Sequence, residues 1–216
     1  MSGHDDFAFD ALPGLPERPP QGEDILWQGR PAALALARDA YGLTWIAGYF
    51  ALIVVWRAAS GSADGGLAMA LAKGLPYLML AGLGLAVVFG LAWIQARSTT
   101  YTITSARVVQ QIGAALPVTF NLPFVKIGSA SLSLKRDGTG TIALQTLGDT
   151  RISYLVAWPH VRPWMAKTEP ALRAIPDAAA VAKLLASAAE TRLAVPVISR
   201  VDGQFAAVAA EYGTAS

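Results

Sequence analysis

Few side chains in this sequence could carry out catalysis. The chain has no cysteine, and its two histidines, His4 and His160, are far apart. No His-Glu-x-x-His pattern, lysine-bearing glycine-rich phosphate loop or Gly-x-Ser-x-Gly elbow occurs. The acids Asp137 and Asp149 stand beside glycine in turn sequences, which is not the arrangement of a paired-carboxylate site. We therefore expect no enzyme, no catalytic or metal-binding residue and no cofactor.

His160 lies in the segment 158–164, WPHVRPW, which combines a stiff backbone with residue types that favour binding. An imidazole nitrogen could ligate a pigment magnesium, but the neighbours of His160 favour a hydrogen-bonded loop residue. Trp158, Arg162 and Trp164 are of the types enriched at interface hot spots, and prolines lower the entropy lost on binding. Tryptophan also lies on bilayer surfaces and in protein cores. All three interpretations of this segment stay open.

A second group consists of small residues at helical spacing. Gly82, Ala86 and Gly90 follow one another at four-residue intervals, so they would form a groove along one helix face. Such a groove lets a neighbouring backbone approach closely. It could pack within this chain, around Ala47 and Ala51, or it could contact a second copy of the chain or a client protein.

Lys135 and Arg136 form the third group, in the segment 135–140, KRDGTG. This composition predicts a hairpin tip that projects two cations, where glycine backbone could also offer N–H groups to an anion. Phospholipid headgroups are therefore candidate ligands, although any exposed turn has a similar composition. Nucleic acid is not an expected partner, because the basic residues are scattered and lack interleaved aromatics.

Two apolar stretches must position these groups. Residues 74–96 contain no charged side chain and lie between Lys73 and Arg97, so they are long enough to span a hydrocarbon core. The stretch 41–56 reaches that length if the helix continues to about residue 60 with Arg57 extended toward the headgroups. A glycine-rich turn over 60–66 joins them. We predict a transmembrane helical hairpin over residues 39–97, with spans near 40–60 and 74–96.

Charge distribution indicates the orientation. The first 40 residues are net acidic and residues 97–200 are net basic. Cations near the spans favour the cytoplasmic side for both termini of a multi-pass protein. Four of them, Arg30, Arg38, Arg97 and Arg107, lie outside the hairpin, and two, Arg57 and Lys73, lie within it. A basic domain there would attract anionic headgroups or acidic partner loops, unless it is simply an ordinary solvated surface.

Beyond the second apolar stretch, the periodicity becomes that of short strands. Predicted strands cover 101–104, 107–112, 118–122, 127–134, 140–147 and 151–158, and an amphipathic helix with Asp177 as its N-cap covers 178–191. Such a helix can close a small barrel or sandwich. The fold class is therefore α+β, with a membrane hairpin followed by a PH-like domain over 98–195. Residues 1–38 are expected to form an extended proline-rich arm, and 196–216 a mobile tail.

Four segments carry a resemblance to a known family: ILWQGRP (25–31), TYTITSARV (100–108), WPHVRPW (158–164) and LRAIPDA (172–178). Over residues 12–195 the chain resembles membrane-anchored bacterial PH-domain proteins, and more closely the photosynthetic complex assembly proteins among them. Members of that group have been described with three spans, whereas this chain offers two stretches of adequate length.

The resemblance implies a non-enzymatic factor that helps to build the bacterial photosynthetic reaction centre and its core light-harvesting complex. The implied partners are the subunits of these complexes and membrane lipid, and the implied location is the bacterial inner membrane. The alternative is a PH-domain protein that binds anionic lipid or maintains the envelope without any connection to photosynthesis.

Overall fold

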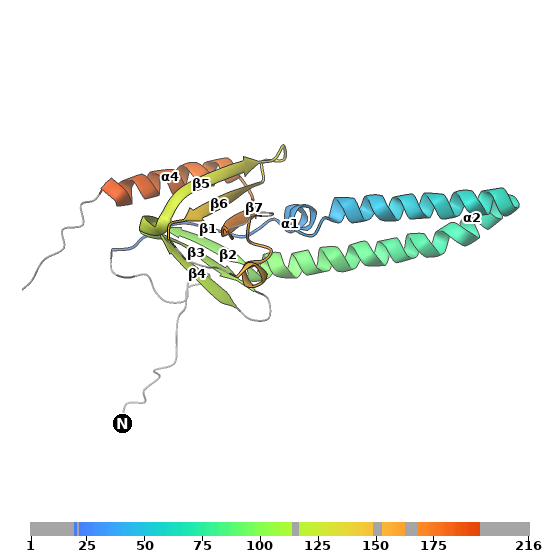
Figure 1. Ribbon diagram of the computed structural model, residues 1–216, viewed down its shortest axis with the longest axis horizontal. Helices are drawn as coiled ribbons and strands as arrows, with labels where there is room; N and C mark the ends of the chain where they lie inside the picture. Colours follow the sequence, from blue (N-terminus) through green and yellow to red (C-terminus); the bar gives the residue numbers. More distant parts are fainter. Residues whose placement is uncertain (1–19, 21, 114–116, 149–152, 163–167, 195–216) are drawn as a thin grey trace, which may run out of the picture.

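A computed structural model describes residues 20, 22–113, 117–148, 153–162 and 168–194. Two antiparallel sheets and a helix form a domain at one end, and a long helical element projects from it (Figure 1). In chain order the elements are β1 (Ile25–Gly29), α1 (Ala33–Asp39), α2 (Leu43–Ser98), β2 (Thr100–Thr104), β3 (Arg107–Ile112), β4 (Val118–Pro123), the 3-10 helix η1 (Phe124–Lys126), β5 (Ile127–Leu134), β6 (Gly140–Thr146), α3 (Tyr154–Ala157), β7 (Ala171–Ile175) and α4 (Ala178–Ala194).

The strands are divided between two sheets, with the orders β1-β2-β3-β4 and β5-β6-β7. Alternating side chains of both sheets, including Tyr101, Ile103 and Leu144, form one buried core with the apolar face of α4. Val181 and Leu185 are the largest buried side chains on that helix. The predicted set of short strands with a C-terminal helix is therefore present. The barrel, however, is not closed, because no strand pairing joins the two sheets within the described residues.

The predicted hairpin corresponds to a single long helical element, α2. Its backbone leaves the helical region at Gly65 (φ −167°, ψ 27°) and Gly66 (φ 68°, ψ −155°), and the chain reverses direction there. The left-handed φ of Gly66 explains the need for glycine. The two arms lie side by side in Figure 1, and Gly84 of the second arm faces the ring of Phe50 in the first. By length and composition, α2 is able to cross a membrane.

Strand β1 pairs antiparallel with β2, although α1 and the whole of α2 lie between them in sequence. Trp27 lies opposite Ile103 and packs against the core, and Gln28 donates a hydrogen bond to the hydroxyl of Thr102 at 3.1 Å. The long helical element is therefore an insertion between two neighbouring strands of the same sheet. Its two ends are held at the same edge of the domain.

Two predictions about local structure were wrong. The arm predicted over 1–38 includes β1 and α1, because the short segment 25–29 finds its strand partner more than seventy residues later. The strand predicted over 151–158 is instead the short helix α3 where it is described, and the third strand of its sheet is β7. In contrast, the strands predicted over 107–112 and 127–134 coincide with β3 and β5. The predicted tail over 196–216 lies outside the described residues.

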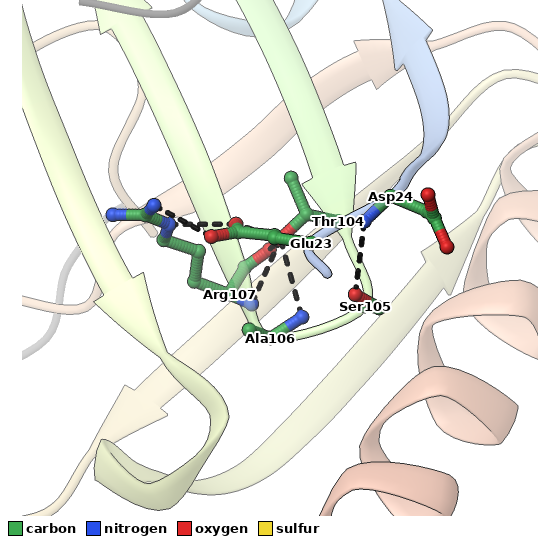
Figure 2. Close-up of polar contacts among 6 residues, drawn as sticks. All are labelled: Glu23, Asp24, Thr104, Ser105, Ala106 and Arg107. Carbon is green, nitrogen blue, oxygen red and sulfur yellow. Dashed lines mark hydrogen bonds and ion pairs between the residues drawn. The ribbon is translucent and has the colours of Figure 1, made fainter. Parts of the chain in front are cut away.

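A bidentate ion pair secures β1 to the turn between β2 and β3 (Figure 2). Arg107 donates from Nε to Oε1 of Glu23 at 2.7 Å and from Nη2 to Oε2 at 2.6 Å. The Thr104 hydroxyl donates to Oε1 at 2.6 Å and accepts the backbone N–H groups of Ala106 and Arg107. Hydrogen bonding from Arg107 lowers the pKa of the Glu23 carboxyl, against the effect of its burial.

Removing this carboxylate should weaken the attachment of β1. We expect Glu23→Gln to lower the free energy of unfolding by about 2 kcal/mol, since it breaks charge-assisted hydrogen bonds to Arg107. Because the pKa of Glu23 is lowered in the fold, this stabilisation is present above the unfolded pKa and is lost as the pH falls through the folded pKa. Denaturant unfolding in detergent micelles measures both effects.

The matched control is Asp24→Asn, which removes the same charge from the adjacent residue. Figure 2 shows the Asp24 carboxylate directed away from Arg107, and Asp24 contacts the turn through its backbone N–H. An equal loss of stability in the two variants would show that general charge, not the ion pair, is responsible.

Candidate functional site

The described part of the segment 158–164 lies where the domain meets α1 and α2. The ring of Trp158 packs edge-on against Tyr41, just before α2, with 5.0 Å between centroids. Arg162 donates to the carboxylate of Glu169 at 3.2 Å. Trp164 lies outside the described residues. The segment therefore contributes both a structural contact and an accessible cation.

His160 is fully buried and bonded through both ring nitrogens. The Tyr101 hydroxyl lies 2.5 Å from Nδ1, and the Thr99 hydroxyl lies 3.0 Å from Nε2. Gln95, near the end of α2, approaches Nε2 at 3.4 Å. The Tyr101 hydroxyl also accepts a hydrogen bond from the backbone N–H of Arg173 at 3.2 Å, so it can donate its own proton to Nδ1 of His160. Nδ1 is then the acceptor, and the imidazole proton is on Nε2. This confirms the hydrogen-bonded interpretation of His160, and neither nitrogen is positioned to ligate a pigment.

Burial holds His160 in its neutral form. Desolvation, with a smaller contribution from the nearby Arg173 charge, lowers the pKa of His160 to about 3. The same environment raises the pKa of Tyr101. The pair therefore acts as a neutral hydrogen-bonded joint between the end of α2 and the domain, and not as a proton-transfer site near neutral pH.

Arg173 extends this joint to α1. Its side chain is only 6% exposed, and it donates to the carbonyl oxygens of Pro159 at 3.0 Å and Asp39 at 2.8 Å. Asp39 is the last residue of α1, where a cation also meets the negative end of the helix. One guanidinium thus fixes the helix that precedes α2 against β7 and the loop before it.

The cations of this region surround an open hollow of about 520 Å³ beside α1. Arg38, Lys135, Arg162 and Arg173 line it, together with the single carboxylate of Asp39. Lys135 forms an ion pair with Asp39, and Arg162 with Glu169. Within the described residues, no carboxylate pairs with Arg38 or Arg173. The hollow therefore has excess positive charge and suits a phosphate or carboxylate ligand.

Lys135 and Arg136, the residues predicted to bind headgroups, lie in different surroundings. Lys135 belongs to the hollow, where desolvation and the charges of Arg173 and Arg38 lower its pKa and outweigh the opposing effect of Asp137. Arg136 is exposed in the adjacent β5–β6 turn, which lies at the end of the domain next to α1. Both residues therefore have access to an anion at the α1 side.

The small-residue groove of α2 does not pack within the chain. A Cβ atom added at Gly82 or Gly90 would meet nothing within 4 Å among the described residues, and Ala86 is exposed. The contact between arms uses another face, at Gly74 and Gly84. The interpretation that this groove packs around Ala47 and Ala51 is therefore wrong, and the groove faces outward.

Sequence reasoning missed Tyr101, Arg173 and Asp39 as parts of this site. Their spacing carries no signal, because three separate elements bring them together. The available indication was Tyr101, whose hydroxyl lies inside a predicted strand, where a buried polar group needs a partner. No strand was predicted around Arg173.

Protonation of His160 should destabilise the joint in acid. The unfolded pKa is near 6.5 and the folded pKa is about 3, so stability is fully present above pH 6.5 and falls as the pH drops toward 3. Between pH 7 and 4, this one group should lower the free energy of unfolding by about 3 kcal/mol. We expect the His160→Gln variant to lack this decrease, although the substitution lowers stability at pH 7. Thermal unfolding at several pH values measures the slope. Identical slopes would assign the acid sensitivity to other groups.

Two comparisons with known proteins agree with this architecture. The profile of a family described as Bacterial PH domain matches residues 41–189, which include α2, β2 to β7 and most of α4. An "Uncharacterized 23.7 kDa protein in puhA 5'region" of Rhodobacter capsulatus is 46% identical over 201 residues, which cover 92% of this chain and 94% of that protein. No solved structure matches the chain.

Proposed function

The chain belongs to the bacterial PH domain family, and on this premise we propose that it is a membrane-anchored, non-enzymatic assembly factor of the PuhB type. Its clients would be the nascent subunits of the photosynthetic reaction centre and the core light-harvesting complex. The position of the relative's gene carries this proposal. That protein is named for the 5' region of puhA, a reaction-centre gene, and it matches nearly the whole chain.

The exposed surface of α2 supports a membrane anchor. Large apolar side chains face outward on both arms, including Trp45, Leu52, Leu83 and Trp93. In water this surface would be a large aggregation-prone patch, whereas in lipid it needs no covering. Each arm, residues 43–64 and 67–98, exceeds the roughly 20 residues that a span requires. We therefore propose that both arms cross the bilayer.

Two features near the membrane suit contacts with client subunits. The groove of Gly82, Ala86 and Gly90 faces away from the other arm, so a client helix could approach its backbone closely. Trp158 packs against Tyr41 at the base of α2, and Arg162 lines the hollow beside α1. If the arms span the bilayer, loops of membrane subunits would leave it near both residues. The buried joint holds this surface in a fixed position, which lowers the entropy cost of binding.

The orientation is testable with topology reporters. Cations outnumber acids near the domain end of α2, whereas at the distal end Lys73 pairs with Asp64 and Arg57 stacks over the Tyr77 ring at 5.0 Å. We expect both termini on the cytoplasmic side, because positive charge is retained there. A reporter inserted at Gly65 should therefore read as periplasmic and one at the C-terminus as cytoplasmic. The opposite pair of signals would place the domain on the other side.

Deletion of the gene tests the assembly function. We expect reaction-centre content to fall under growth that requires photosynthesis, while the complexes that do form keep normal charge separation, because the protein acts only during construction. Absorption spectra of membranes and flash-induced photo-oxidation measure the two quantities. Equal reaction-centre content in deletion and parent strains would eliminate this function.

Matched variants can separate the contact surfaces. Gly82→Leu with Gly90→Leu should lower complex yield at unchanged protein level, because leucine blocks close helix approach. Gly48→Leu is the control, since a Cβ atom there also meets nothing within the described residues. Equal complex yields in the double variant and in the Gly48→Leu control would show that the groove contacts only lipid.

A second candidate function is the binding of anionic lipid, unconnected with photosynthesis. The hollow beside α1, with Arg38 and Arg173 unpaired by carboxylates in the described region, favours it.

As an assembly factor, the protein should lose more complex yield when Arg162 and Trp164 are replaced by alanine than when Lys135 and Arg136 are. Unchanged complex yield in both double variants would favour the lipid-binding function, because that function is unconnected with photosynthesis.

A further inference from the structure

Strand β5 has the most exposed edge of the domain. Seven of its eight residues are exposed, whereas every residue of β7 at the opposite edge of the same sheet is buried. Within the described residues, β5 pairs only with β6, so its outer N–H and C=O groups have no strand partner. Natural edge strands are usually protected by charges, proline or bulges. Strand β5 has no charge or proline between Ile127 and Leu134, and its only register irregularity lies at its start, between Ile127 and Ser129. The regular edge from Ser129 to Leu134 is therefore a template for an added strand.

An apolar groove of about 340 Å³ runs along this edge, between β5 and α4. Ala130 and Leu132 lie opposite the core residues Leu144 and Ile142, so they point to the core side of the sheet. Leu132 is nevertheless 40% exposed. On the α4 side the groove is lined by the small residues Ala182, Ala186 and Ala189. The core side of β5 therefore offers space for side chains from an additional strand.

A second copy of the chain does not fit this edge if α2 spans the bilayer. The strand rises from η1 toward the end of the domain next to α1 and α2, and Lys135 just beyond it contacts Asp39. Two copies in one bilayer would be related by an axis along the membrane normal, so both β5 strands would rise toward the membrane. A symmetric edge contact requires antiparallel strands, which this arrangement prevents.

The direction of β5, toward the end of the domain next to α2, suits pairing with a segment of a client chain. A segment that leaves the bilayer beside α2 could continue along β5, whose eight residues extend about 26 Å. Among the described residues, Glu190 is the only charged one that lines the groove, and no ion pair is found for it there. The groove therefore selects an extended, mainly apolar segment with a basic side chain near Glu190.

We propose that the outer edge of β5 binds one extended extramembrane segment of a client membrane protein as an additional β-strand. Alternate apolar side chains of that segment enter the β5–α4 groove, and a basic side chain pairs with Glu190. This inference rests on the proposed function for the identity of the client, a reaction-centre or core light-harvesting subunit.

Photo-crosslinking in photosynthetically growing cells tests it. The full-length protein carries p-benzoylphenylalanine in place of Ala130, and mass spectrometry identifies the attached peptide. We expect a terminal or loop segment of a reaction-centre or light-harvesting subunit. Ala186→Lys, which places a charged chain in the groove, should lower adduct yield about tenfold. Ser187→Lys is the control on the same exposed part of α4, outside the groove, and should leave the yield within about twofold.

An adduct with a second copy, with residues 195–216 of the same chain or with lipid would overturn the proposal, as would no adduct. Equal effects of Ala186→Lys and Ser187→Lys would overturn it too. The two hypotheses fail separately. If deletion lowers reaction-centre content but no groove-dependent adduct forms, only the β5 inference fails. If deletion has no effect but a groove-dependent adduct forms with an extended segment of another membrane protein, the docking mode stands and the proposed function fails.

Discussion

The pairing of β1 with β2 is the constraint on which the rest of this structure depends. Because these strands are neighbours, the α1–α2 insertion must leave and re-enter the sheet at one edge, with only α1 and a short connection between strand and helix. Adjacent strands lie about 4.8 Å apart, so the first arm of α2 leaves the domain close to the point where the second arm re-enters it. The two arms therefore lie side by side. The Glu23–Arg107 pair holds β1 in register. The domain is therefore a continuation of the helical arms and not a body on a flexible tether.

Buried hydrogen bonds make that junction rigid. Tyr101, His160 and Arg173 come from β2, the loop before β7 and β7 itself, and together they bond to Thr99, Pro159 and Asp39. In a low-dielectric interior, each of these groups is costly to leave unpaired, so the arrangement is strongly specified. The neutral state of His160 avoids adding a second positive charge beside Arg173. If the protein is the assembly factor proposed above, such a joint favours binding, because the binding surfaces need no ordering.

Two regions of the domain have opposite chemistry. The hollow beside α1 is cationic and lies at the α2 end, where anionic headgroups or acidic loops would be within reach if the arms span a bilayer. The β5–α4 groove is apolar, with one carboxylate, and follows the strand away from α2. The electric field of the cationic hollow extends over about a Debye length, whereas burial of apolar surface in the groove requires direct contact. If the proposed function is right, this chain combines anchoring through α2 with client contact through its PH-like domain.

The sequence by itself determined what depends on local composition: the apolar arms, the glycine break, the strands β3 and β5, and the helix α4 with its apolar face. Charge-free runs, period-two alternation and helical spacing are readable within one segment. Only the tertiary structure decided that 25–29 is a strand, that 154–157 is helical and that His160 is buried, because each depends on partners distant in the chain. It also decided that Gly82 and Gly90 face outward, since helical spacing defines a face but not what that face meets. Long-range pairing and burial are properties of the assembled chain, and no single segment carries them.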